Sequence, residues 1–124
     1  NVDVPATAGF YLVVVNLKDE TIEVVPAAVY GIGDCFGGYD PAKAENKFNS
    51  DASSVNLTKA LLAGDLRFHV AASTLKCDWW QAEFMVLNGK IEYRGTGNDQ
   101  TRVNVTAGSH TITLDFKANT GSVN

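Results

Sequence analysis

The side chains best suited to chemistry are concentrated in residues 76–94, where both tryptophans of the protein, Trp79 and Trp80, stand side by side. Cationic and amide side chains lie before and after this pair. A tryptophan ring is a flat apolar plate that stacks on the C–H face of a sugar ring, while planar polar groups hydrogen-bond the sugar hydroxyls. These residue types indicate a carbohydrate-binding site. The predicted ligand-binding residues are Trp79, Trp80, Lys76, Gln81, Arg94 and Tyr39.

The same stretch predicts a β-hairpin. Asn88-Gly89 separates two apolar runs, and both residues tolerate the positive φ that a tight hairpin turn requires. Neighbouring residues of a strand point to opposite faces, so a strand through Trp79 and Trp80 would direct one ring to the core and the other to solvent. The outward ring is either a ligand plate or a cover for a sheet edge, and both interpretations stay open at this point.

Catalytic groups are hard to find in this sequence. It has no Gly-X-Ser-X-Gly elbow, and no two carboxylates are placed by the pattern so that they converge. His69 and His110 lie far apart, and each is expected to be a surface strand residue rather than a zinc ligand. We therefore expect a binding protein and not an enzyme, with no metal and no other cofactor. The carboxylates considered as a catalytic pair are Asp34, Asp40, Asp65, Asp78, Glu83, Glu92 and Asp99.

Length and composition narrow the class of protein further. A chain of 124 residues has the size of one domain, and its net charge of -4 without a basic patch argues against a nucleic-acid partner. No apolar run approaches the roughly 20 residues of a membrane span, and no signal peptide is recognised. Cys35 and Cys77 permit one disulfide, which two lone cysteines neither require nor exclude.

Alternation of apolar and polar residues predicts strands through almost the whole chain, and no segment has the spacing of a helix longer than one or two turns. Pro26 is expected to end a strand that begins at Thr21, and residues 42–45 are expected to hold one helical turn, with Phe48 as an anchor. The predicted fold is an all-β, immunoglobulin-like β-sandwich of about eight or nine antiparallel strands. Its predicted core consists of Val13, Val15, Leu17, Tyr30, Ile32, Leu66, Phe68, Val70, Ile112, Leu114 and Phe116.

The two ends of the chain repeat each other. Residues 7–18 align without gaps on residues 106–117, and Thr21 and Val24 then match Thr120 and Val123. The pattern predicts a tandem array of units about as long as this chain, each bounded by such a hairpin. We therefore expect one module over residues 1–124, in which residues 1–26 form a hairpin like the closing hairpin and residues 27–124 form the main body.

Three motifs in order support a family resemblance: Val29-Tyr30-Gly31-Ile32-Gly33-Asp34 with the following Gly-Gly-Tyr-Asp loop, Leu61-Leu62-Ala63-Gly64-Asp65-Leu66, and the Thr-Ala-Gly closing strand that starts at Thr106. The sequence resembles the repeated modules of SusE/SusF-type outer-membrane starch-binding proteins. Tyr39 stands where these modules usually have tryptophan, and Cys35-Phe36 replaces small residues. The ligand residues named above rest on their own chemistry and not on these motifs.

The resemblance implies a non-catalytic module that holds α-glucan chains such as starch at the cell surface, in the outer membrane of a glycan-uptake system. The implied partners are a polysaccharide or oligosaccharide and other surface glycan-binding proteins. The membrane would be reached only through a lipid anchor outside this segment. The alternative is a structural spacer or protein-docking β-sandwich, because one fold serves several functions.

Overall fold

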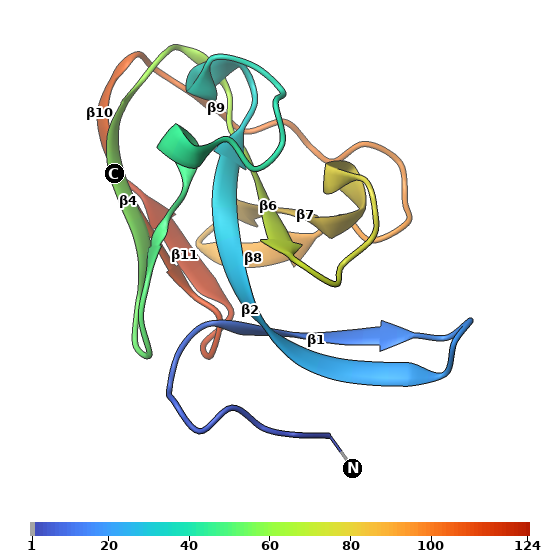
Figure 1. Ribbon diagram of the computed structural model, residues 1–124. Helices are drawn as coiled ribbons and strands as arrows, with labels where there is room; N and C mark the ends of the chain where they lie inside the picture. Colours follow the sequence, from blue (N-terminus) through green and yellow to red (C-terminus); the bar gives the residue numbers. More distant parts are fainter. Residues whose placement is uncertain (1) are drawn as a thin grey trace.

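The computed structural model describes residues 2–124 and consists almost entirely of β-strands joined by short turns (Figure 1). Helical structure in this range is limited to the 3-10 helices η1 (Asp34–Phe36), η2 (Ala44–Asn46) and η3 (Trp79–Ala82). Within residues 2–124, none of these has the length or apolarity to cross a bilayer. The strands are β1 (Tyr11–Asn16), β2 (Thr21–Ile32), β3 (Asn49–Ser50), β4 (Val55–Leu61), β5 (Gly64–Asp65), β6 (Arg67–Ala72), β7 (Glu83–Leu87), β8 (Lys90–Tyr93), β9 (Asn104–Val105), β10 (Gly108–Asp115) and β11 (Thr120–Val123).

Nine strands form one antiparallel sheet in the order β1-β2-β6-β7-β8-β11-β10-β4-β3, and β5 pairs with β9 separately. β8 and β11 are joined at the single pair Lys90–Thr120, and there the sheet turns over on itself. β2, β6, β7 and β8 thus form one layer, and β11, β10, β4 and β3 form the other (Figure 1). The predicted all-β sandwich is confirmed, with the expected antiparallel pairing throughout.

The core lies between these two layers. Val29, Phe68 and Phe84 come from the first layer, and Ile112 and Leu114 come from β10 in the second, all of them fully buried. Burial of apolar side chains from both layers is what holds two such sheets together. The predicted core residues Ile32, Leu66, Phe68, Ile112 and Leu114 are buried, whereas Tyr30, Val70 and Phe116 are half-buried.

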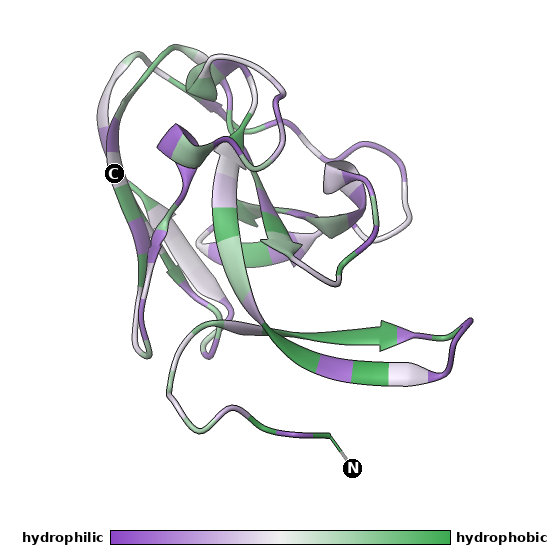
Figure 2. Cartoon of the chain, viewed as in Figure 1, coloured by the Kyte–Doolittle hydropathy of each residue, from purple (hydrophilic) through white to green (hydrophobic). Residues whose placement is uncertain are grey.

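Three predicted core residues are wrong. Val13 and Val15 are 56% and 57% exposed, and Leu17 in the following turn is 86% exposed. Val13 and Val15 lie on β1, which pairs with the first half of β2 in a hairpin that projects from the body (Figure 1). Figure 2 colours β1 as hydrophobic over most of its length and the paired half of β2 as mixed. Within residues 2–124, no second layer lies opposite Val13 and Val15.

Pro26 does not end a strand, contrary to expectation. β2 runs without interruption from Thr21 to Ile32, pairing first with β1 and then with β6. The amide of Ala27 donates to the Phe10 carbonyl at 3.2 Å, so the nitrogen of Pro26 points away from β1. Pairing with β6 starts only at Ala27, and the missing N–H of Pro26 therefore interrupts no ladder.

Two local predictions are confirmed and one is shifted. Asn88 and Gly89 have φ of 51° and 77° and connect β7 to β8, as the hairpin motif predicted. Phe48 is buried and contacts Phe68 edge-on, with ring centroids 5.6 Å apart. The helical turn expected at residues 42–45 is η2, which begins two residues later at Ala44.

Candidate functional site

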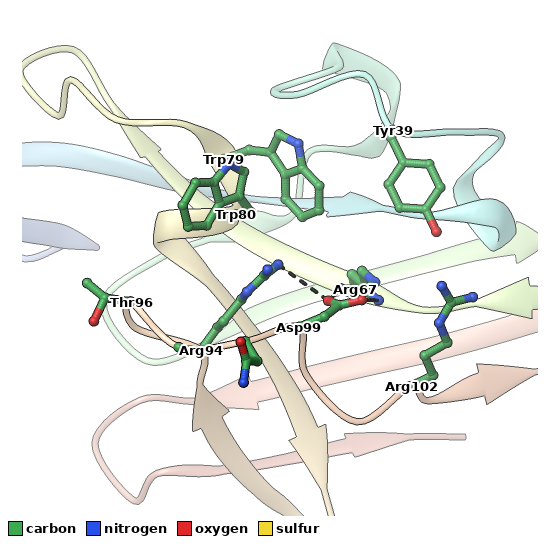
Figure 3. A pocket seen from close by; sticks show the side chains of 10 residues that line it. Tyr39, Arg67, Trp79, Trp80, Arg94, Thr96, Asp99 and Arg102 are labelled. Atoms are coloured by element: carbon green, nitrogen blue, oxygen red, sulfur yellow. Dashed lines mark hydrogen bonds and ion pairs between the residues drawn. The ribbon is translucent and has the colours of Figure 1, made fainter.

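An open pocket of about 600 Å³ lies at one end of the first layer, between η3 and the loop that follows β8 (Figure 3). Aromatic rings form one side of it, and cationic and polar groups form the other (Figure 3). The pocket is wide open to solvent, as a site for part of a long polymer must be. Its lining residues are Tyr39, Arg67, Trp79, Trp80, Arg94, Thr96, Gly97, Asn98, Asp99 and Arg102.

Trp79 and Trp80 lie in the 3-10 helix η3 and not in a strand, which corrects the expectation that one ring faces the core and the other solvent. Both side chains are half-buried and both line the pocket. Consecutive residues of a 3-10 helix are rotated by about 120°, rather than the near 180° of a strand, so both rings can serve one site. The Asp78 amide donates to Gln81 Oε1 at 2.9 Å and closes this turn.

The aromatic side of the pocket extends from Trp80 through Trp79 to Tyr39 (Figure 3). The Trp79 and Tyr39 ring centroids are 6.1 Å apart and their planes are inclined by 42°, so these rings form an angled surface rather than a flat one. Arg94 Cζ lies 5.2 Å from the Trp80 ring centroid, within cation–π range. Tyr39 Oη donates to Asp65 Oδ2 at 3.1 Å, and partial burial together with this bond raises the pKa of Tyr39.

A buried arginine forms the floor of the pocket. Arg67 is 3% exposed and donates through Nε to Asp65 Oδ2 at 2.6 Å and through Nη1 to Glu83 Oε1 at 2.8 Å. Its two Nη atoms also reach the Asp99 carboxylate, at 2.6 and 3.2 Å. Two-point binding of a carboxylate by a guanidinium restricts orientation as well as distance. Arg67 therefore ties the Asp99 loop to β6.

Arg94 reinforces the same cluster from β8's end. Its Nη1 donates to Glu83 Oε2 at 2.7 Å and lies 3.4 Å from Asp99 Oδ1. The hydrogen bond from Arg67 lowers the pKa of Asp99 and raises that of Arg67, so both stay charged. Three carboxylates thus converge, which the sequence pattern did not indicate. Each accepts hydrogen bonds from an arginine, and together these ion pairs fix the loop that carries Asp99.

The pocket brings together four of the six predicted ligand-binding residues: Trp79, Trp80, Arg94 and Tyr39. Lys76 and Gln81 are not among its lining residues. Lys76 Nζ donates to the Ser73 carbonyl at 2.7 Å, within its own loop, and the Gln81 side chain is used by the turn described above.

Of the polar side of the pocket, sequence reasoning identified only Arg94. Arg67 lies between the predicted core residues Leu66 and Phe68, where strand alternation alone would direct a side chain to solvent, and two of the carboxylates that pair with it, Glu83 and Asp99, are distant in sequence. Thr96, Asn98 and Asp99 line the pocket from the loop after β8 and were not among the predicted ligand-binding residues. The one signal available was the density of hydrogen-bonding residues in that loop directly after the hairpin.

The remaining nucleophile and metal candidates do not form a second site. His69 is buried rather than on the surface, its Nε2 accepts from the Ala42 amide at 3.1 Å, and burial lowers its pKa. Both cysteines are free, and burial raises the pKa of Cys35 to about 12, which makes it a poor nucleophile. Among residues 2–124 no cluster of three potential metal ligands occurs.

Known proteins match this chain over nearly all of its length. The outer membrane protein SusF of Bacteroides thetaiotaomicron is 33% identical over 131 residues, which cover 94% of this chain and 25% of SusF. The crystal structure of SusF from the same organism superimposes with a TM-score of 0.77 at 31% identity, over 92% of this chain and 27% of that chain. The chain thus spans about a quarter of the length of this relative.

The family model for SusF/SusE starch-specific carbohydrate-binding modules matches residues 28–122. That range includes both layers of the sandwich and every residue that lines the pocket. A binding module and not an enzyme was the prediction from the residues, and the family confirms it. The chain belongs to the SusF/SusE family of starch-specific carbohydrate-binding modules.

Proposed function

We propose that this module binds a starch-like α-glucan in the pocket between η3 and the 94–102 loop and does not cut it. Trp79, Trp80 and Tyr39 stack on successive sugar rings, while Arg94 and Asn98 hydrogen-bond their hydroxyls from the opposite side. The observation that carries the proposal is the meeting of three aromatic rings and several polar groups on one open pocket of a chain in this family.

The angle between the rings favours a curved ligand. An α-1,4-linked glucan coils, whereas a β-1,4-linked glucan is extended and fits a flat row of rings. The planes of Trp79 and Tyr39 are inclined by 42°, which suits neighbouring sugars that turn relative to each other. Arg67 and Asp99 contribute indirectly, because their ion pair holds the polar loop at the correct distance from the rings.

A site this open binds weakly. A few stacked rings and solvent-exposed hydrogen bonds give an affinity of roughly micromolar to millimolar per module. The relative is an outer membrane protein, and we propose the same cell-surface location for the protein that contains this module, held by a lipid anchor outside this segment. Its partners there would be the polysaccharide and other surface glycan-binding proteins.

Affinity electrophoresis of single variants tests this function. In gels containing soluble starch, Trp79→Ala and Trp80→Ala should each lose retention by at least about tenfold, because each removes one stacking plate. Their melting temperatures should change little, since both rings are only half-buried. Tyr93→Ala is the matched control, because Tyr93 is 61% exposed but does not line the pocket.

A second gel tests the preference for an α-linked glucan. Gels with a soluble β-1,4-glucan derivative should retain neither the unmodified protein nor the variants, because the 42° angle between the Trp79 and Tyr39 rings does not suit an extended chain. A parent that starch does not retain, or tryptophan variants that run like Tyr93→Ala, would contradict the proposal. That outcome would favour the alternative of a structural spacer or protein-docking domain.

A further inference from the structure

The two hairpins at the ends of the chain have the same geometry. β1 pairs with β2 so that Asn16 lies opposite Thr21, and β10 pairs with β11 so that Asp115 lies opposite Thr120. Each position of the first hairpin matches the position 99 residues later in the second, as in the gapless alignment of residues 7–18 on residues 106–117. The residue before each returning strand has positive φ, 53° at residue 20 and 57° at residue 119.

The apolar faces of the two hairpins differ in what covers them. Ile112 and Leu114 are 0% and 1% exposed. Their counterparts Val13 and Val15 are 56% and 57% exposed, although they occupy the equivalent face of the first hairpin. Leu17 and Ile22 extend this face and are also exposed. Four large apolar side chains on one small hairpin are more than scattered surface residues and indicate an interface.

The second hairpin identifies what is missing from the first. β10 pairs with β4 over seven residues, and Ile112 lies opposite Leu57 in that ladder. β1 occupies the corresponding position but lies at the edge of the sheet, and within residues 2–124 no strand pairs with its outer side. The amide of Thr111 donates to the Asn124 carbonyl, so that of Ile112 faces β4. By the same alternation, the amides of Val13 and Val15 face the empty side of β1.

We propose that residues 10–25 are the closing hairpin of another β-sandwich of the same kind, which lies before this one in the same polypeptide. The strand equivalent to β4 in that sandwich pairs with the outer edge of β1, and the face formed by Val13, Val15, Leu17 and Ile22 enters its core. The family model supports this division, because its match begins at residue 28, after the hairpin. An unprotected edge strand of this length would otherwise invite aggregation.

The continuity of β2 gives the proposal a mechanical consequence. Its first half would belong to the preceding sandwich and its second half to this one, with no linker between them. Two sandwiches that share one strand are held in a fixed relative orientation, unlike modules joined by a flexible segment. Ile22 also specifies one feature of the partner. Its counterpart in the second hairpin is Gly121, where an added Cβ would lie 2.6 Å from Val86. The residue of the preceding sandwich that corresponds to Val86 must therefore be smaller than valine.

Amide hydrogen exchange tests the assignment on unmodified protein. In the isolated chain of residues 1–124, the amides of Val13 and Val15 should exchange nearly as fast as in a peptide. In the complete gene product, they should exchange slower by roughly 100-fold or more, because a ladder covers them. Equal exchange at these two amides in both proteins would overturn the proposal.

A charge placed on the exposed face provides a second, independent readout. Val13→Asp should leave the melting temperature of the isolated chain unchanged. In the complete gene product it should speed amide exchange in the sandwich before residue 10 by roughly 100-fold, because the carboxylate enters that core. Leu62→Asp is the matched control, since Leu62 is 60% exposed but lies on the main body.

Two outcomes would count against the assignment. Val13→Asp with no more effect than Leu62→Asp in the complete gene product would mean that nothing covers this face. A complete gene product that is a dimer, and that Val13→Asp makes monomeric, would mean that the face binds a second copy of the protein. Starch retention enters neither readout, so failure of the glucan proposal would leave this test intact.

Discussion

The β1–β2 and β10–β11 hairpins have equal registers, equivalent turns and apolar residues at matching positions of one face, yet one encloses the core and the other lies in solvent. The comparison separates two kinds of information in a sequence. Strand pairing and turn position follow from local pattern, since they agree in both hairpins. Burial does not follow from local pattern, because it requires a second layer that other parts of the chain must provide.

The most direct way to break this comparison is to make the same chemical change on both apolar faces. Ile112→Ala should lower the free energy of unfolding of the isolated chain by about 2–5 kcal/mol, because it leaves a cavity in the core. Ile22→Ala should change it by no more than about 0.5 kcal/mol, since Ile22 is 49% exposed. Urea denaturation followed by tryptophan fluorescence measures both, because both indoles lie in the main body.

The same pair of variants sharpens the comparison in the complete gene product. If the first hairpin closes a preceding sandwich, Ile22→Ala should lower the free energy of unfolding of that sandwich in the complete gene product. If both variants lowered the free energy of unfolding of the isolated chain by similar, large amounts, the first hairpin would be part of the core of this module. The contrast between the hairpins would then disappear.

The fold could be predicted from the sequence because its signals are local. The alternation in residues 66–70 and 112–116 and the Asn88-Gly89 turn specify strands and a connection without reference to the rest of the chain. The errors occurred where a long-range partner decides the outcome. Val13 has the pattern of a core residue but no facing layer, and Pro26 passes through a strand because its nitrogen faces no partner.

The aromatic part of the candidate site was also predictable, because Trp79, Trp80 and Tyr39 are conspicuous by residue type and lie outside the clear core positions. Of its polar part, only Arg94 was predicted. Arg67 and Asp99 are 32 residues apart, and only the folded sheet places the guanidinium beneath the loop. The 3-10 helix at Trp79–Ala82 was equally hidden, since four residues are too few to display a helical period.

A smaller effect is expected from separating the two halves of β2. In the complete gene product, inserting Gly-Ser-Gly-Ser between Pro26 and Ala27 should free the two sandwiches to move relative to each other, because the shared strand becomes a flexible linker. Small-angle scattering should report a broader distribution of dimensions. Retention on starch should fall by no more than about tenfold, since a loosened pair loses part of its effective concentration.

The control for this insertion is the same sequence placed between Ala52 and Ser53, in an exposed turn of the main body. That variant should scatter like the parent. If the Pro26 insertion also leaves the scattering unchanged, β2 is not a rigid junction between two sandwiches. The first hairpin would then differ from the second in more than the absence of a facing layer.

The smallest effect concerns the two turns, where the hairpins share a backbone conformation but not a residue type. Glu20 and Asn119 both have positive φ, and asparagine tolerates this region far better than glutamate. Asn119→Glu should therefore lower the free energy of unfolding of the isolated chain by about 1 kcal/mol. Glu20→Asn should favour its hairpin by a similar amount but leave the unfolding of the main body unchanged, because that hairpin contributes little to the core. Slower amide exchange confined to residues 11–25 would be its signature, measured beside denaturation curves for both variants. A rise in the stability of the entire chain with Glu20→Asn would instead mean that the projecting hairpin and the sandwich unfold as one unit.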